Sequence, residues 1–143
     1  MKKNDLKVIV FNRQRKIPID TRPLDVFARQ IAARLNLTSG FSVTLVSDSS
    51  MERYNRQFRG KDQPTDVLSF PYDPEGFDHE DPYMGDIVIS AETAERQKRE
   101  TLIGELKVLC LHGVLHLMGH DHETDAGQMK ALEQRLKEEF RLN

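Results

Sequence analysis

The stretch from Leu102 to Met118 constrains the fold most, because it is apolar on nearly every side. A helix of this kind needs protein around its whole circumference, so we expect it in the middle of the molecule. No stretch approaches the roughly 20 apolar residues of a membrane span. The only cysteine, Cys110, falls in this segment and is expected to be a small buried hydrophobe. A buried central helix is therefore the first expectation.

The length of 143 residues fits one ordinary domain, 1–143, with a core that needs no disulfide or structural metal. Charged residues make up 31% of the chain and apolar residues 38%, which indicates a soluble globular protein. The net charge of -2 lacks the basic surplus of a non-specific duplex DNA binder. A nucleic acid substrate would have to meet a local basic patch.

Alternating or β-branched segments predict strands, and apolar residues at three- and four-residue spacing predict amphipathic helices. Strands are expected over 6–12, 41–48, 65–72 and 85–90, with an exposed acidic loop over 73–85. Helices are expected after a cap at Asp20 or Thr21, from Ser49 or Ser50 to Gly60, and over 91–100, 102–118 and 125–141. This order predicts an α+β architecture in a single domain: a small mixed sheet of about four strands packed with about five helices.

Four of the five histidines lie within HGVLHLMGHDH, from His112 to His122. His112 and His116 are four residues apart, so on a helix they share one face and can reach one ion. Histidines can also be ordinary core residues hydrogen-bonded to the backbone. That reading suits the isolated His79, but the spacing of the cluster favours a metal site at the end of the central helix.

The third ligand is expected to be His122. On a straight helix His120 would lie about 12 Å along the axis from His112, too far to share an ion with it. Gly119 can adopt the left-handed conformation that ends a helix, which lets His122 return to the metal. Three imidazoles with an open position are typical of catalytic zinc, so we expect one Zn2+ per chain. Another divalent metal such as nickel or copper could also bind.

The spacing H-x3-H-x5-H also matches the metzincin zinc proteases, with one departure. Gly113 stands where those proteases have the glutamate that acts as general base. Glycine cannot transfer a proton. The pattern therefore leaves a metallopeptidase-like hydrolase as an alternative and disfavours proteolysis by the usual route.

Three motifs together resemble the YbeY family of bacterial metal-dependent endoribonucleases: HGVLHLMGHDH, RGKDQPTDVLSFP (59–71) and GDIVIS (85–90). They lie in family order over the central half of the chain. The resemblance implies a small α+β fold and zinc on His112, His116 and His122. It also implies cleavage of single-stranded RNA, in 16S ribosomal RNA 3'-end maturation and in ribosome quality control. The implied partners are ribosomal RNA precursors and the ribosome or ribosome-associated proteins.

The family's essential arginine falls on Arg59, which is the candidate catalytic residue. Zinc can activate water and polarise a phosphoryl oxygen, and a guanidinium can contact two phosphate oxygens at once. Arg53, Arg56 and Lys61 are candidates for a phosphate-binding track, although such a group can also be a solvated face. Asp121 could orient a liganding histidine or cap the turn, and these alternatives remain open.

Two further expectations concern the cellular setting. The charged start of the chain does not suit a signal peptide and one cysteine cannot form an intrachain disulfide, so a cytoplasmic protein without membrane association is expected. A non-enzymatic alternative is a zinc-bound ribosome-biogenesis factor with little intrinsic catalysis. Cleavage of RNA by the purified protein separates it from the endoribonuclease hypothesis.

Overall fold

The structure is a computed structural model that describes residues 6–61, 65–72, 82–119 and 127–142. These residues form four strands and five helices, as the sequence predicts. In chain order the elements are β1 (Val8–Asn12), α1 (Arg22–Arg34), β2 (Gly40–Val46), α2 (Asp48–Arg59), β3 (Val67–Pro71), β4 (Tyr83–Ser90), α3 (Ala91–Gln97), α4 (Leu102–Leu117) and α5 (Gln128–Glu139). The expected α+β class is confirmed.

The four strands form one mixed sheet in the order β1-β2-β4-β3. β1, β2 and β4 run parallel to one another, whereas β3 runs antiparallel to β4. In the register, Val43 of β2 lies opposite Val10 on one side and Ile87 on the other. β3 is consequently an outer strand, and its second edge is not paired with any strand of the described residues.

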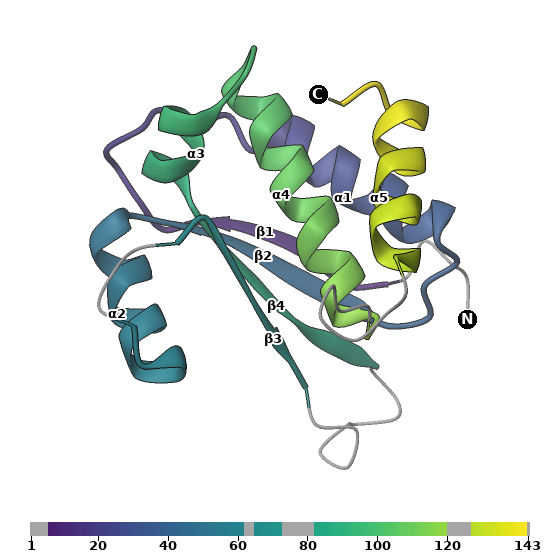
Figure 1. Cartoon of the computed structure of the whole chain (residues 1–143), viewed down its shortest axis with the longest axis horizontal. Helices are drawn as coiled ribbons and strands as arrows, with labels where there is room; N and C mark the ends of the chain where they lie inside the picture. The colour runs from purple at the N-terminus through teal and green to yellow at the C-terminus, as the bar shows by residue number, and fades with distance from the viewer. Residues whose placement is uncertain (1–5, 62–64, 73–81, 120–126, 143) are drawn as a thin grey trace.

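One face of the sheet carries the main hydrophobic core. Figure 1 shows α1, α4 and α5 gathered over this face. α4 contacts α1, α3, α5, β3 and β4, and Leu106, Leu111 and Leu115 on it are fully buried. The expected buried central helix is confirmed. Cys110 lies in the same core, where burial raises its pKa to about 12, so this thiol is an inert apolar group.

The other face of the sheet is covered in part by α2. Met51 of α2 packs with Val46, Leu68 and Val88 in a second, smaller apolar cluster. This cluster holds α2 against β3 and β4. One face of the sheet is therefore covered by several helices, and the other face only in part by α2.

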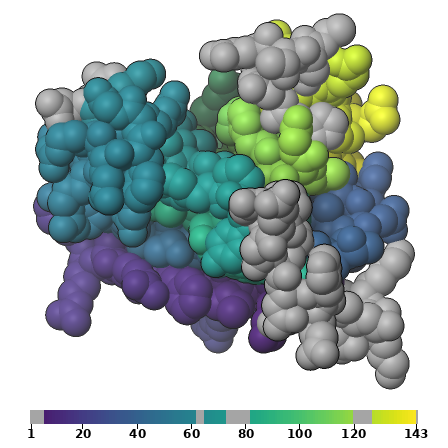
Figure 2. Space-filling model, turned by 90° about the horizontal axis from the view of Figure 1, so that it is seen from below, coloured from purple at the N-terminus to yellow at the C-terminus, as the bar shows by residue number. Residues whose placement is uncertain are grey.

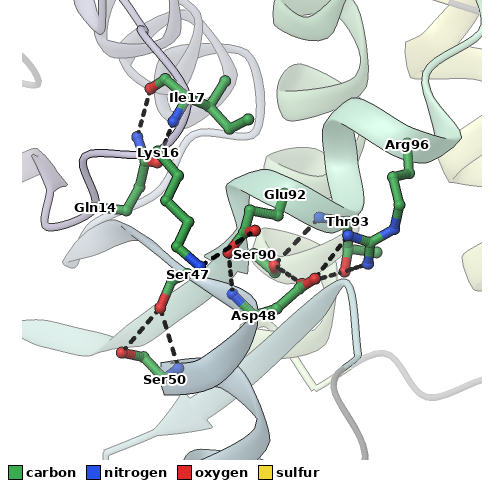
Figure 3. Close-up of polar contacts among 10 residues, drawn as sticks. All are labelled: Gln14, Lys16, Ile17, Ser47, Asp48, Ser50, Ser90, Glu92, Thr93 and Arg96. Carbon is green, nitrogen blue, oxygen red and sulfur yellow. Dashed lines mark hydrogen bonds and ion pairs between the residues drawn. The ribbon is translucent and has the colours of Figure 1, made fainter.

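The start of α2 differs from the sequence expectation of Ser49 or Ser50. Ser47 is the N-cap: its Oγ accepts a hydrogen bond from the Ser50 backbone N–H, and the helix begins at Asp48. Asp48, expected as the last residue of a strand, instead accepts hydrogen bonds from Ser90 Oγ at 2.6 Å and Thr93 Oγ1 at 2.7 Å (Figure 3). A long-range polar network thus selects the helix start among several residues that could cap it.

Other element boundaries also differ from the expectation. β4 begins at Tyr83, inside the expected loop, because Tyr83 pairs with Gly40 of β2. α3 ends at Gln97, since Lys98 has an extended backbone with ψ of 144°. The first and third strands and α5 are each shorter than expected, by one to three residues at an end. The N-cap of α1 is Thr21, but Asp20 Oδ1 accepts the Arg22 N–H instead of the threonine hydroxyl.

Within the described ranges, no helix is both long and apolar enough to cross a bilayer.

Candidate metal and active site

α4 packs directly against the sheet at Gly113, which lies between the two histidines. A Cβ atom built on Gly113 would lie 2.7 Å from Cγ2 of Ile87 on β4. The Ser69 hydroxyl of β3 also donates a hydrogen bond to the Gly113 carbonyl at 3.3 Å. Gly113 therefore lets α4 pack directly on the sheet, and no larger residue fits without a shift. A glutamate at this position would have to displace the Ile87 side chain.

His112 and His116 share the half-buried side of α4, as their four-residue spacing predicts. Their Nε2 atoms lie 3.0 Å apart and their ring centroids 4.5 Å apart. Two nitrogens bound to one tetrahedral zinc at about 2.1 Å would be separated by about 3.4 Å. The two imidazoles are thus positioned to share a single ion after a small adjustment.

A carboxylate from α5 holds one of these rings. Nδ1 of His112 lies 3.0 Å from Oε2 of Glu133, and Lys137 Nζ lies 3.5 Å from the other carboxylate oxygen. Burial opposes the charged form of Glu133, but the hydrogen bond with His112 and the nearby Lys137 outweigh it and lower the pKa of Glu133. An ionised Glu133 accepts Nδ1–H of His112, which favours the tautomer whose Nε2 is the acceptor nitrogen.

The sequence analysis did not identify Glu133 as part of the site. The available signal was its place on α5, four residues after Met129 and three before Leu136, both fully buried. A carboxylate on the buried stripe of an amphipathic helix needs a partner. Which partner it has depends on how α5 packs against α4, and local spacing does not show that.

Arg59 and the two histidines meet at one cavity of about 490 Å3. Arg59 is the last residue of α2, and the two histidines lie on α4. Residues of β3 line the cavity between Arg59 and the histidines. The lining residues are Arg59, Thr65, Asp66, Val67, Leu68, Ser69, His112 and His116. Asp66, which sequence reasoning also missed, accepts a hydrogen bond from Gln97 Nε2 at 3.1 Å. A cation, a carboxylate and two imidazoles thus line one polar space.

The end of α2 places Arg59 at this cavity. Gly60 has φ of 69°, and its N–H donates to the Arg56 carbonyl, so the helix ends as the sequence predicts. Arg59 is exposed, and no carboxylate of the described residues forms an ion pair with it. Its guanidinium is available to an anionic ligand.

The candidate phosphate-track residues do not line this cavity. Arg53, Arg56 and Lys61 are all exposed on or just after α2. Arg53 lines a different hollow, together with Arg13 and Tyr54. The structure therefore brings Arg59 and the histidines together but leaves these three cations around the outside.

The expected third ligand, His122, falls in residues 120–126, outside the described ranges. His120, Asp121 and His79 also lie outside them. Gly119 is described and has φ of 93°, so the expected left-handed turn after the helix is confirmed. Among the described residues, no three histidine, cysteine or acidic side chains form a metal-binding group. His122 remains a prediction.

A comparison of the whole chain with known protein families tests the family resemblance that the three motifs suggest. The family described as "Endoribonuclease YbeY" matches residues 9–141, nearly the whole chain. The chain belongs to the YbeY endoribonuclease family. The resemblance read from the three motifs is confirmed.

Relatives in the YbeY family cover almost the full length. An endoribonuclease YbeY from Geobacter sulfurreducens is 40% identical over 138 residues, which is 93% of this chain and 91% of the relative. One from Sulfurovum is 36% identical over 140 residues, covering 94% and 92%. One from Solibacter usitatus is 41% identical over 122 residues, covering 83% and 78%.

A solved structure agrees with the fold. The solution structure of a Thermotoga maritima protein superposes with a TM-score of 0.59 at 26% identity and covers 94% of this chain and 92% of its own. The architecture described above is thus shared with an experimentally determined structure.

Proposed function

We propose that the protein is a zinc-dependent endoribonuclease that cleaves single-stranded RNA in the cavity between α2, β3 and α4. The observation that carries the proposal is the convergence of Arg59, His112 and His116 on that one cavity. Membership in the YbeY family supports RNA as the substrate. The metal and the roles of individual residues follow from the chemistry of the side chains.

His112, His116 and His122 would hold the metal. Two of the three are described, and the distance between their Nε2 atoms suits a shared ion. A bound zinc supplies a Lewis acid that polarises a phosphoryl oxygen and activates water. Glu133 keeps His112 in the tautomer whose Nε2 is an acceptor, and it fixes the ring orientation.

Arg59 would bind the scissile phosphate. Charge grows on the non-bridging oxygens during phosphodiester cleavage, and a planar guanidinium can donate to two of them at once. Because no described carboxylate pairs with Arg59, binding the phosphate breaks no ion pair among the described residues. The 490 Å3 cavity leaves room for a phosphate and part of a nucleoside.

The cellular role that follows from the family resemblance is 16S ribosomal RNA 3'-end maturation and ribosome quality control. We propose ribosomal RNA precursors and ribosome-associated proteins as partners, in the cytoplasm, with 1–143 as one catalytic domain. The metallopeptidase alternative is not favoured, because membership in the YbeY family supports RNA as the substrate and Gly113 cannot act as a general base.

The direct test is cleavage of a defined single-stranded RNA by purified protein, with and without zinc, beside a duplex of the same sequence. His116→Ala, purified identically, excludes a contaminating nuclease. We expect zinc-dependent cleavage of the single strand that His116→Ala lacks. Equal cleavage by both proteins would contradict the proposal, and absence of cleavage by the zinc-loaded protein would favour a non-catalytic ribosome-biogenesis factor.

A further inference from the structure

A groove lies on the sheet face opposite α4, where α2 leaves the strands uncovered. Its volume is about 490 Å3 and it follows β1, β2 and β4 beside α2. Figure 2, a view from below relative to Figure 1, shows the teal atoms of α2 and the purple atoms of β1 on the same side of the molecule. Five aromatic rings contribute to the lining: Phe11, Tyr54, Phe58, Phe70 and Tyr83.

Several of these rings are exposed although they are large and apolar. Phe58 is 57% exposed, Phe11 39% and Tyr54 36%. The Tyr54 and Phe58 rings are nearly parallel, with centroids 6.3 Å apart, and Phe70 packs edge-on against Phe58 at 5.1 Å. Rings that stay in solvent add little to the core, whereas exposed ring faces can stack with flat ligands.

Arginines accompany the rings. The Arg13 guanidinium lies 5.3 Å from the Phe11 ring centroid and lines both the groove and an adjoining hollow of about 290 Å3, which Arg53 also lines. No carboxylate of the described residues pairs with Arg13 or Arg53, in contrast to Arg22 and Arg96. Arg53 Nη2 donates to Ser50 Oγ at 3.0 Å, a neutral partner, so an anionic ligand would meet no described carboxylate competing for either arginine.

One carboxylate lies in the groove, but its contacts are already made. Asp86 accepts hydrogen bonds from Ser42 Oγ at 2.6 Å and from the Tyr83 hydroxyl. Burial and this hydrogen bond raise the pKa of Tyr83, so its hydroxyl stays a donor to Asp86. The Asp86 carboxylate is thus held at the sheet surface by Ser42 and Tyr83. Arg13 and Arg53 both line the hollow beside α2, and Asp86 does not.

The groove adjoins the candidate active site. Phe58 precedes Arg59 in the last turn of α2, and the two side chains line the groove and the active-site cavity respectively. β3 connects them in the same way, with Leu68 at the cavity and Phe70 at the groove. A flexible chain cut beside Arg59 could therefore continue along the open sheet face.

We propose that this groove binds single-stranded RNA next to the cleavage site, with bases stacked on Phe58, Tyr54 and Phe11 and phosphates near Arg13 and Arg53. Aromatic platforms with arginines recognise single strands with little sequence preference, because every base has a π-face. A duplex hides those faces, so the groove favours single strands. The proposal rests on the proposed endoribonuclease function. It states where the RNA substrate continues beyond the active-site cavity.

The test compares Phe58→Ala and Arg13→Gln with matched controls on other surfaces. Val26→Ala truncates an apolar residue that is 53% exposed on α1, and Arg99→Gln removes an exposed cation from a hollow beside Lys137. Affinity for a fluorescein-labelled single-stranded RNA of twelve nucleotides is measured by anisotropy with zinc-loaded protein. All proteins compared, the wild type included, carry Arg59→Ala, which is expected to slow cleavage while keeping the metal. Intact RNA after the titration is verified on a gel.

We expect each groove variant to weaken binding about tenfold, the effect of losing one base stack or one phosphate contact. Both controls should bind as the wild type does. Ultraviolet crosslinks should map to 8–13 and 53–59, a readout that needs no variant. Wild-type affinity in both groove variants, or crosslinks confined to other segments, would overturn the proposal.

Measuring RNA binding and RNA cleavage separately distinguishes failure of the groove proposal from failure of the proposed endoribonuclease function. If the protein binds single strands through the groove but zinc never produces cleavage, the endoribonuclease proposal fails while the groove stands. If zinc-dependent cleavage occurs and the groove variants bind RNA normally, the groove proposal fails alone.

Discussion

Nδ1 of His112 lies 3.0 Å from Oε2 of Glu133, so a residue of α5 supports a predicted metal ligand on α4. The contact joins positions 21 residues apart in the sequence. It links the packing of the last helix to the chemistry of the central one.

Glu133→Gln should therefore weaken zinc binding, by about 10- to 100-fold, because the amide is a poorer acceptor for Nδ1–H and orients the ring less firmly. The measurement is a competition titration with a zinc chelator. Glu138→Gln, on the exposed side of the same helix, is the matched control and should retain wild-type affinity. Equal affinities for the two variants would show that Glu133 serves packing alone.

Metal content should identify the ligands. His112→Ala and His116→Ala should lose about one divalent ion per chain, and His122→Ala should do the same, while His120→Ala retains it. Elemental analysis of the four variants, with circular dichroism to verify folding, gives the answer. Retention by His122→Ala together with loss by His120→Ala would contradict the chain reversal predicted after Gly119.

The fold could be predicted from the sequence wherever the signal is local. Apolar spacing, β-branched composition and capping residues together indicated all nine elements. The glycines at 60 and 119, expected at helix ends, both have a positive φ. The candidate ligands on α4 followed from helical spacing. Arg59 required the family resemblance, because a helix-end arginine has no distinctive local pattern.

Features that depend on tertiary pairing could not be predicted in the same way. Tyr83 lies in an acidic, proline-containing segment and becomes a strand residue only through its partner Gly40. Asp48, Ser49 and Ser50 could all begin a helix, and the contacts of Asp48 with α3 decide the start. Glu133 belongs to the site because α5 packs on α4.

Gly113→Ala should lower the free energy of unfolding by about 1–3 kcal/mol, although an alanine would ordinarily favour a helix. The added methyl would meet Cγ2 of Ile87 at 2.7 Å. Urea denaturation gives the value. In an Ile87→Ala background the obstructing side chain is absent, so the same substitution should become neutral or stabilising. An equal loss in both backgrounds would argue against this contact as the cause.

Asp48 should make stability sensitive to acid. Burial opposes its charged form, but hydrogen bonds from Arg96, Ser90 and Thr93 outweigh this and lower its pKa below 3.8. A group whose pKa is lower in the folded protein stabilises it above the unfolded pKa, and this contribution disappears as pH falls through the folded pKa.

Asp48→Asn should consequently cost about 1–3 kcal/mol at pH 7, and its difference from the wild type should shrink below about pH 4. Urea denaturation at both pH values measures the difference. Asp25→Asn, which removes one exposed ion pair with Arg29, should cost less than 1 kcal/mol. A pH-independent deficit in Asp48→Asn would mean that its charge does not contribute.

The central claim is that Arg59 acts with the histidine-bound metal on one phosphate, and the cleavage rate of Arg59→Lys tests it most directly. Lysine keeps the charge but loses the planar fork, so we predict a substantial fall in RNA cleavage, and roughly a 100-fold fall for Arg59→Ala. Zinc content should be unchanged in both variants. Wild-type cleavage rates in both zinc-loaded variants would contradict the account.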